Sequence, residues 1–581
     1  MWVFVKRYTF KYWPYYAVGF LFLIITNYIS TLIPLLLKNV LDLILIPSTT
    51  FSIIRPTLLA IVFYAVILAF TRTLSRVLIF IAGRRVEFDL RNDLFNTFLT
   101  LSDRFFRGEK IGDLISRMIN DMQSLRATAA LGFLHIINTI MIFSFVCYQM
   151  ISINLKLTLF MLIPIPLMLL VVKLFVKEFY ISIKQTQEVL GDVTHFFVET
   201  LTHIKIVKSY VAESKMINIF DPLNDLFFKK SIKQARIRTA IFPFIAIGGS
   251  LGQIFLLLIG GQLIIEEKLS IGDFVAMSSY VALLAWPTAS LAWIINIIQR
   301  GKSSWARISK IFNEKVDFPI ESSNGSSQLT SQIIPSVKLN NLSFSYSKNG
   351  NSTDKVLENI SFKIKAGSVL GVFGPSGSGK TTLARILAGT ELLDNDKYFI
   401  NGHCFNTWDV KDFRSQISYV QQEPFLFSVP VSENVDFQET DHDHEKIKAM
   451  TDLAVVSADI ETFTEQYDTL IGERGVVLSG GQKTRLALSR ALFKPHSFLI
   501  LDDVLSAVDH ETEQQLIANL QKDKDVRTTI IISHRISALT HCDHIIVLDK
   551  GRIIDQGNHN ELIKKDGLYK FSWQYQKMTN E

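Results

Sequence analysis

Hydrophobic and polar positions divide the chain into two halves. From residue 13 to about residue 300, long apolar runs alternate with charged segments; from about residue 335 the apolar runs are short and separated by polar turns. A helix that crosses a bilayer needs about 20 mostly apolar residues, and six runs in the first half reach that length. The predicted spans are 14–37, 56–81, 129–152, 155–176, 241–265 and 273–298.

Positive charge predicts the orientation of these spans. Lysines and arginines gather in the two long polar segments, 82–128 and 177–240, and are few in the short breaks between spans. The positive-inside rule therefore places both long segments and both termini in the cytoplasm. Both segments have helical periodicity, so they are expected to extend the spans as helices. Each is interrupted once, at 103–113 and 210–216, by either a short transverse helix or a plain hairpin turn.

Two further features of the first half have two interpretations each. Met1–Tyr12 mixes aromatic and basic residues, which is typical of an interfacial helix but also of a frayed tail. Arg72 and Arg76 lie near the second span on one helix face. A charge inside a membrane is expensive and often marks a pathway, whereas an arginine at the interface simply extends its head to water.

A serine-rich stretch, 321–331, separates the two halves. The predicted domains are a membrane domain over 1–312, a linker over 313–335 and a soluble domain over 336–581. Net charge of +6 and three widely spaced cysteines add little. They indicate no nucleic-acid partner, no disulfide framework and a reducing compartment for the soluble part.

The soluble half contains a phosphate-binding loop between a predicted buried strand, 368–374, and a predicted helix, 382–388. Glycines let the backbone approach phosphate closely, and the first amides of the helix point at anionic oxygens. In this loop Lys380 is placed to reach the β- and γ-phosphates of ATP, and Thr381 to bind Mg²⁺. The predicted nucleotide-binding residues of the loop are Gly374, Pro375, Ser376, Gly377, Ser378, Gly379, Lys380, Thr381 and Thr382.

A second potential anion site opens a later amphipathic helix. Ser479 stands where a helix cap would, and the glycines after it permit close backbone approach. One ATP cannot easily engage both sites of one chain, which suggests that two chains share nucleotides. The residues of this signature are Leu478, Ser479, Gly480, Gly481 and Gln482.

Polar residues at the ends of apolar strands supply candidate catalytic groups. Asp502 and Asp503 follow the strand 498–501; Asp502 suits Mg²⁺, and Asp503 is placed to orient or deprotonate a water. His534 ends another apolar strand, and α/β sheets place their site residues at this edge. The metal ligands that this pattern predicts are Thr381 and Asp502.

Three signals in the soluble half are weaker. Tyr346 follows a predicted strand and is either a platform for adenine or an ordinary strand aromatic. Gln421 or Gln422, in the loop after another strand, could reach a metal or a water. The stretch 441–445 alternates aspartate and histidine, but a solvated loop is a better interpretation than a metal site.

Together these motifs resemble those of the ATP-binding-cassette (ABC) ATPases in order and approximate spacing. The LSGGQ signature is diagnostic, because many unrelated ATPases have only the phosphate loop. Six spans ahead of the cassette resemble an exporter half-transporter, and the stretches 285–301 and 478–483 resemble bacterial multidrug-resistance-like (Mdl) subunits. The fold class implied is a helical membrane domain with six spans joined to an α/β P-loop ATP-binding-cassette domain.

This resemblance implies roles for individual residues. Tyr346 matches the adenine-stacking aromatic, Gln422 the metal-binding Gln-loop residue and His534 the switch histidine; the implied cofactors are ATP and Mg²⁺. Stretch 506–509 matches the D-loop, 469–475 an exporter loop, and the two interruptions match coupling helices. In the family, each ATP lies between one chain's phosphate loop and the other chain's LSGGQ.

One position departs from the family pattern. The residue after the metal-binding aspartate is normally glutamate, but here it is Asp503. Its carboxylate is withdrawn by about one C–C bond, ~1.5 Å, and a misplacement of that order costs roughly 10²-fold in rate. The resemblance therefore implies one half of a heterodimer, in which Asp503 belongs to an impaired site and LSGGQ completes the competent one.

The expected function is ATP-driven efflux of hydrophobic or amphipathic compounds, drugs or lipids, across the bacterial cytoplasmic membrane. The expected catalytic residues are Asp503, His534, Lys380 and Gln422. The expected partners are a second half-transporter, membrane lipids and a small amphipathic substrate. Alternatives are a homodimeric lipid flippase and an ATP-gated regulator or channel on the same frame.

Overall fold

The computed structural model of the chain has two compact units. The first comprises Met1–Phe98 and Gly112–Glu314, and the second comprises Leu99–Ile111 and Lys315–Glu581. A short segment from between the predicted spans thus belongs to the second unit. The structure describes residues 1–46, 50–314, 334–348, 351–352, 355–391, 393, 396–408, 410–437, 443–472, 477–522 and 526–580. The predicted linker stretch 321–331 therefore lies outside the described residues.

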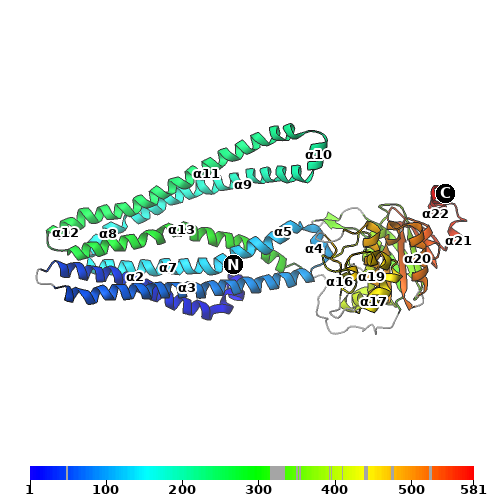
Figure 1. The fold of residues 1–581 in the computed structure, drawn as a ribbon, viewed down its shortest axis with the longest axis horizontal. Helices are drawn as coiled ribbons and strands as arrows, with labels where there is room; N and C mark the ends of the chain where they lie inside the picture. Colours follow the sequence, from blue (N-terminus) through cyan, green and yellow to red (C-terminus); the bar gives the residue numbers. More distant parts are fainter. Residues whose placement is uncertain are drawn as a thin grey trace. The chain divides into compact units, whose positions relative to one another are not determined.

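The described residues of the first unit form helices joined by short turns (Figure 1). Its N-terminal part contains α1 (Trp2–Phe4), η1 (Val5–Thr9), η2 (Phe10–Tyr12), α2 (Trp13–Ile44) and α3 (Phe51–Thr100). It continues with α5 (Ile111–Ser116), η3 (Arg117–Asp121), α6 (Met122–Ala127), η4 (Thr128–Gly132), α7 (Phe133–Ile153) and α8 (Leu155–Leu162). It ends with α9 (Pro164–Thr202), α10 (Ile204–Ser209), α11 (Glu213–Phe255), η5 (Leu256–Gly260), α12 (Gly261–Ile265) and α13 (Ile271–Phe312).

Four helical stretches in the described residues are long and apolar enough to cross a membrane. They are Trp2–Ile44, Phe51–Thr100, Ile111–Ile153 and Ile271–Phe312. They contain the predicted spans 14–37, 56–81, 129–152 and 273–298. The other two predicted spans, 155–176 and 241–265, lie on α8, α9, α11, η5 and α12, partly where side chains are not described. Those two spans remain a prediction.

Helices α9 and α11 run side by side as an arm with α10 near its tip (Figure 1). The interruption predicted at 210–216 contains a turn, at 210–211, but the short helix α10 lies before that stretch, at Ile204–Ser209. Val211 has φ of 49°, a left-handed conformation that a β-branched residue rarely adopts. That turn ends the short helix, and 213–216 already form the start of α11.

The N-terminal residues are helical and held against α3. Arg7 and Tyr8 both donate to Asp93 Oδ2, at 3.0 and 2.7 Å. One turn later, Lys11 Nζ donates to Asp89 Oδ2 at 2.6 Å. The segment is therefore an ordered part of the helical unit rather than a frayed tail.

The second unit contains α4 (Asp103–Gly108) and an α/β domain. The strands of the domain form a six-stranded sheet in the order β12-β11-β5-β10-β9-β8, a four-stranded sheet in the order β4-β1-β6-β7, and a β2-β3 pair. They are β1 (Val337–Phe344), β2 (Ser347–Lys348), β3 (Asn351–Ser352), β4 (Leu357–Ile364), β5 (Val369–Phe373), β6 (Tyr398–Ile400), β7 (His403–Cys404), β8 (Ile417–Val420), β9 (Phe498–Asp502), β10 (Thr528–Ser533), β11 (His544–Asp549) and β12 (Arg552–Gly557).

Helices surround these sheets and end the chain. They are α14 (Lys380–Leu387), η6 (Phe405–Thr407), α15 (Val410–Ser415), α16 (Val431–Val435), α17 (His444–Leu453), α18 (Ser457–Glu461), η7 (Gln466–Asp468), α19 (Gly480–Phe493), η8 (Val504–Ala507), α20 (His510–Lys522), η10 (Ser537–Leu539), α21 (His559–Leu562) and α22 (Leu568–Asn580).

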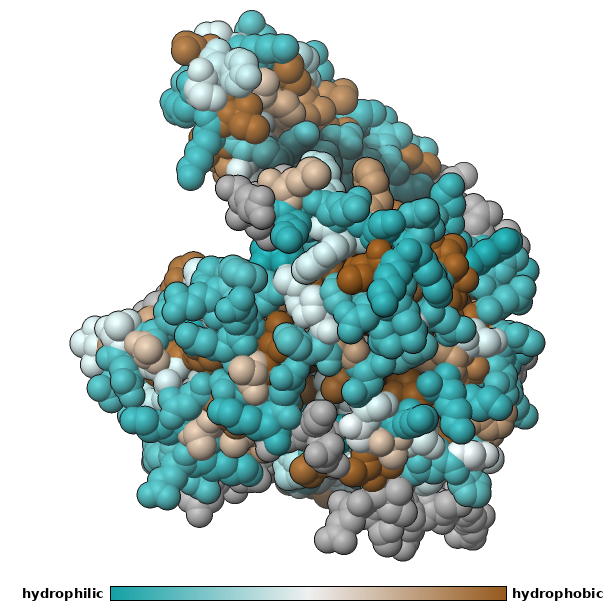
Figure 2. All heavy atoms as spheres, turned by 90° about the vertical axis from the view of Figure 1, so that its right-hand side faces the viewer, coloured by the Kyte–Doolittle hydropathy of each residue, from teal (hydrophilic) through white to brown (hydrophobic). Residues whose placement is uncertain are grey.

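Parallel pairing in the larger sheet brings the functional strand ends together. Strands β8, β9, β10, β5 and β11 are parallel neighbours, and only β12 is antiparallel. Ser533 is level with Phe373, and Ile532 is level with Asp502. Every residue of β9 is buried, as its unbroken apolar sequence predicts. The face of the molecule drawn in Figure 2 is mostly hydrophilic, with smaller hydrophobic areas between the hydrophilic ones.

Candidate nucleotide-binding and hydrolysis site

The predicted phosphate loop connects β5 to α14 at the carboxyl edge of the larger sheet. A Cβ added at Gly374 would lie 2.2 Å from the Leu548 carbonyl oxygen, so the loop can pass there only without a side chain. Gly377 and Gly379 have φ of 80° and 100°, in the region that favours glycine. Gly379 is the N-cap of α14 and provides no side-chain cap. The first amides of this helix are thus available to an anionic ligand.

Lys380 folds back over this loop. Its amine donates to the backbone oxygens of Gly374 and Pro375, at 2.7 and 2.9 Å. Burial lowers the pKa of Lys380, and the nearby carboxylates of Asp503 and Asp502 oppose that shift. The lysine therefore carries charge into a partly desolvated pocket, where an added anion would be strongly attracted.

Two observations indicate that this loop fits a triphosphate with Mg²⁺. The Ser378 hydroxyl is buried and has no hydrogen-bond partner among the described residues, although buried polar groups normally have one. Thr381 Oγ1 lies 3.4 Å from Asp502 Oδ1, so a hydroxyl and a carboxylate converge as hard oxygen ligands. Asp502 is 1% exposed, and burial raises its pKa, which a bound cation would reverse.

Asp503 lies at the centre of the candidate hydrolytic site. Both of its carboxylate oxygens are 3.0 Å from His534 Nδ1. The Ser506 hydroxyl donates to Oδ1, and Gln422 Nε2 lies 3.5 Å from Oδ2. The structure thus brings together Asp503, His534 and Gln422, and of the two candidate glutamines it favours Gln422.

These donors change the chemistry of Asp503. Burial alone would raise the pKa of this carboxyl, but the hydrogen bonds from His534 and Ser506 outweigh it and lower the pKa. Asp503 also has φ of 57°, a left-handed conformation that aspartate tolerates better than most residues. A carboxylate with a lowered pKa is a weaker base.

Tyr346 is fixed close to the phosphate loop. Its hydroxyl lies 3.1 Å from Thr382 Oγ1, and its ring stands perpendicular to Phe344 with centroids 5.1 Å apart. The guanidinium group of Arg107 lies over the Tyr346 ring, with its central carbon 4.7 Å from the ring centre. Tyr346 is therefore held beside Thr382, which directly follows the phosphate-loop threonine.

The LSGGQ segment forms the predicted capped helix start. Ser479 Oγ accepts from the Gln482 amide at 3.2 Å, and Gln482 Oε1 accepts from the Ser479 amide at 3.0 Å. Gln482 Nε2 also donates to Asp459 at 2.9 Å. A Cβ at Gly480 would meet nothing within 4 Å, so the backbone is open to a ligand.

Several residues of the site were not predicted from the sequence. One is Tyr419, whose hydroxyl lies 3.3 Å from Asp502 Oδ2. It is the third residue of β8, and this position near the end of a strand could have indicated that it belongs to the site. Ser506 was identified only as part of the D-loop match. The ion pair between Arg107 and Glu391 could not be predicted, because the two residues lie far apart in the sequence.

Other predicted sites are only partly described. Among the described residues, no group of three or more histidine, cysteine, aspartate or glutamate side chains could hold a metal ion. Of the stretch 441–445, residues 441 and 442 lie outside the described residues. Residues 473–475 of the exporter-loop match are also outside.

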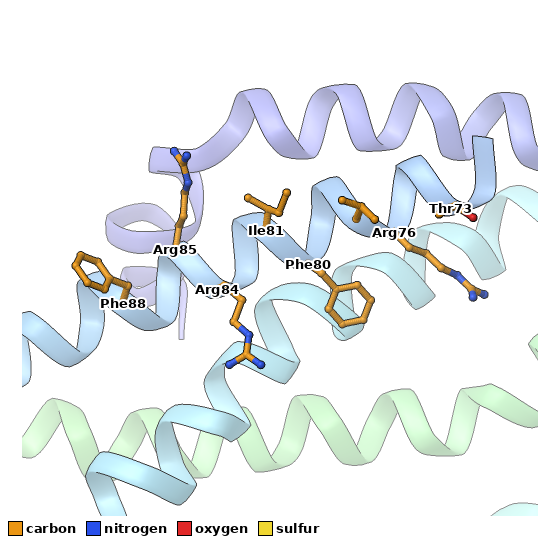
Figure 3. A pocket seen from close by; sticks show the side chains of 8 residues that line it. Thr73, Arg76, Phe80, Ile81, Arg84, Arg85 and Phe88 are labelled. Atoms are coloured by element: carbon orange, nitrogen blue, oxygen red, sulfur yellow. The ribbon is translucent and has the colours of Figure 1, made fainter. Parts of the chain in front are cut away.

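Arg72 and Arg76 lie on α3, and no ion pair is recorded for either among the described residues. Arg76 lines an open groove of about 620 Å³ along this helix. In Figure 3 its side chain lies on the same side of α3 as Phe80 and Arg84, whereas Ile81 and Arg85 extend from the other side. The groove mixes cations with apolar side chains and contains no carboxylate.

The phosphate loop, the two acidic residues at a strand end and the membrane-length helices define a membrane-bound ATPase. Family models agree: residues 16–288 match the ABC transporter transmembrane region and residues 357–506 match the ABC transporter ATPase domain. The chain is 32% identical to the multidrug resistance-like ATP-binding protein MdlA of Buchnera aphidicola subsp. Schizaphis graminum, over 99% of this chain and 98% of the relative. It is also 32% identical to MdlA of Escherichia coli K12, over 89% and 86% of the two chains.

The chain belongs to the ABC transporters, with the transmembrane region and the ATPase domain fused in one polypeptide. A solved structure of a bacterial Atm1-family ABC exporter with ATP bound has the same fold, with a TM-score of 0.81, 22% identity and 98% coverage of each chain. The expected fold class is thus confirmed. The protein is a membrane protein with an ATPase coupled to transport, and ABC exporters of this fold function as dimers.

Proposed function

We propose that this chain is one half of a heterodimeric exporter that moves hydrophobic or amphipathic compounds out of the bacterial cytoplasm. Both termini and the ATPase domain lie on the cytoplasmic side of the inner membrane. The multidrug-resistance-like relatives support efflux, and the concentration of cations in the long helical loops supports the orientation.

In this proposal the phosphate loop binds ATP. Lys380 and the amides of α14 neutralise phosphate charge, and Tyr346 supports the adenine. Thr381, Asp502 and Gln422 would hold Mg²⁺, and the ion would supply positive charge to neutralise the phosphates. The convergence of Thr381 and Asp502 and the orphaned Ser378 hydroxyl support this arrangement.

The observation that carries the heterodimer is the environment of Asp503. Its short carboxylate is held by His534 and Ser506, and its pKa is lowered. Such a group is poorly placed and poorly basic for activating a water. The LSGGQ segment, in contrast, is well formed and open. We therefore assign Asp503 to a weak site and Ser479 to a competent site that uses the partner's phosphate loop and a glutamate.

Two substitutions in this chain test the assignment. The chain is co-expressed with an exporter half that has glutamate after its metal aspartate, and ATP turnover of the pair is measured in lipid nanodiscs. Ser479→Glu adds a negative charge where the partner's ATP phosphate binds, and it should lower turnover by roughly 10²-fold or more. Asp503→Asn changes only the weak site and should leave turnover close to that of the unmodified pair.

Equal losses from the two substitutions would contradict the assignment, because they would mean that both sites hydrolyse ATP. Brisk turnover by this chain alone would favour the homodimer. Passive ion conductance gated by ATP, without substrate-stimulated turnover, would favour a regulator or channel.

A further inference from the structure

Helix α4 has an unusual position, because it comes from the chain between two long helices of the first unit yet packs within the second unit. One of its side chains, Arg107, reaches the proposed base platform. The central guanidinium carbon of Arg107 lies 4.7 Å from the centre of the Tyr346 ring. That distance is within the range of a cation–π contact.

Arg107 is anchored at this place by two carboxylates. Its terminal nitrogen forms an ion pair with Glu391, and its Nε lies 3.3 Å from Asp103 Oδ2. The Glu391 side chain is only 5% exposed. Burial raises the pKa of Glu391, and the charge of Arg107 opposes that shift. Loss of Arg107 would leave this carboxylate buried without its cation, so the arginine is held firmly.

The Tyr346 ring is restrained on several sides. Its hydroxyl contacts Thr382, which directly follows the phosphate-loop threonine, and Phe344 packs perpendicular to the ring. Arg107 then covers one face. A ring fixed in this way loses less conformational freedom when it binds a base.

We infer that Arg107 is a positioning residue of the base subsite, which fixes the plane of Tyr346 and so links the docking of α4 to adenine binding. This inference rests on the proposed function of Tyr346. Because linkage is reciprocal, whatever strengthens base stacking also strengthens the docking of α4 by the same factor. The helix that follows α3 would thus respond to the base as well as to the phosphates.

The test measures affinities of the full chain in lipid nanodiscs by calorimetry, with MgATP and with magnesium tripolyphosphate, which has no base. Arg107→Gln should weaken MgATP binding about fivefold and leave tripolyphosphate binding unchanged. Arg104→Gln, on the same helix, is the matched control and should change neither. Arg107→Lys keeps the positive charge, so its affinity for MgATP should lie between those of Arg107→Gln and the unmodified chain. Glu391→Gln removes the anchor of Arg107 and should lower the affinity for MgATP.

The outcomes separate this inference from the proposed function. If Tyr346→Ala does not weaken MgATP binding, Tyr346 is not the base platform and the site assignment fails. If Tyr346→Ala weakens it but Arg107→Gln behaves like Arg104→Gln, only the role of Arg107 is overturned. Equal weakening of MgATP and tripolyphosphate by Arg107→Gln would also overturn it, because the arginine would then act on the whole loop. Should Arg107→Gln fail to fold, Arg107→Lys and Glu391→Gln decide the same question.

Discussion

A buried carboxylate collects several donors in each unit of this protein, but the donors differ in kind. In the helical unit, the Glu87 side chain is 7% exposed and contacts three arginines. In the nucleotide-binding unit, the Asp503 side chain is 13% exposed and contacts an imidazole, a hydroxyl and an amide. The arginines around Glu87 are Arg84 at 3.1 Å, Arg91 at 2.7 Å and Arg126 at 3.2 Å.

This difference separates a structural carboxylate from a reactive one. Arginine keeps its charge at any physiological pH, and the ion pairs of Glu87 with these arginines join α3 to α6. The partners of Asp503 are instead a half-exposed imidazole, a hydroxyl and an amide, none of which carries a fixed charge like that of an arginine. The number of donors does not decide the role; their chemistry and their access to water do.

The largest expected effect comes from removing the charge of Glu87. Glu87→Gln leaves three arginines without their carboxylate. Breaking a buried pair costs about 3–5 kcal/mol, and because these arginines are partly exposed we expect about 3 kcal/mol less stability. Denaturant titration of helical circular dichroism in mixed micelles would measure this loss, while MgATP affinity should not change.

The matched control for this substitution is Glu188→Gln. Glu188 is an exposed partner of Lys184 on α9, at 3.7 Å. Exposed pairs contribute little to stability, so the control should unfold like the unmodified chain. If Glu87→Gln were equally harmless, the three-arginine cluster would not join these helices.

The second-largest expected effect tests whether Asp503 is a weak base because its side chain is too short. Asp503→Glu restores the missing methylene and should raise ATP turnover of the chain, purified alone in nanodiscs, by roughly 10²-fold. The Asp503→Asn chain gives the baseline of this measurement. An unchanged rate in the glutamate variant would show that the contacts with His534 and Ser506, rather than reach, limit the site.

The smallest effect concerns acid stability of the nucleotide-binding unit. Burial lowers the pKa of His496 to about 4; its Nδ1 lies 2.7 Å from the Lys494 carbonyl, and Arg527 lies 3.3 Å from Nε2. The unfolded histidine has a pKa of about 6.5, so as pH falls from 6.5 to 4 the unfolded state takes up a proton that the folded state refuses. Stability should therefore fall across this window, by about 2 kcal/mol after allowance for partial exposure.

Unfolding of the full chain followed by tryptophan fluorescence at several pH values would measure this loss. His496→Gln should flatten the acid limb between pH 6.5 and 4. His510→Gln, at an exposed histidine of α20, should leave it unchanged. An acid limb that is identical in all three chains would assign the loss to other groups.

The sequence predicted the elements that local pattern specifies. Apolar length located the four described membrane-length helices, and the strand-loop-helix pattern located the phosphate loop. The sequence predicted an interruption at the tip of the arm, at 210–216, but not that the short helix precedes it, because the turn at Val211 that ends this helix has a backbone conformation that side-chain pattern does not favour. Residue pattern alone left Gln421 and Gln422 open, and the family resemblance favoured Gln422; in the structure Gln422, after β8 and beside β9, lies 3.5 Å from Asp503.

The sequence by itself determined that this protein is a fused membrane ATPase, since spans and phosphate loops are encoded by contiguous residues. It also revealed Asp503 where its family has glutamate. Only the tertiary structure decided which groups surround that carboxylate, because Ser506, His534 and Gln422 meet through the parallel register of three strands. It alone placed Arg107 on Tyr346, 239 positions away along the chain, because contacts between distant segments depend on how the units fold rather than on local pattern.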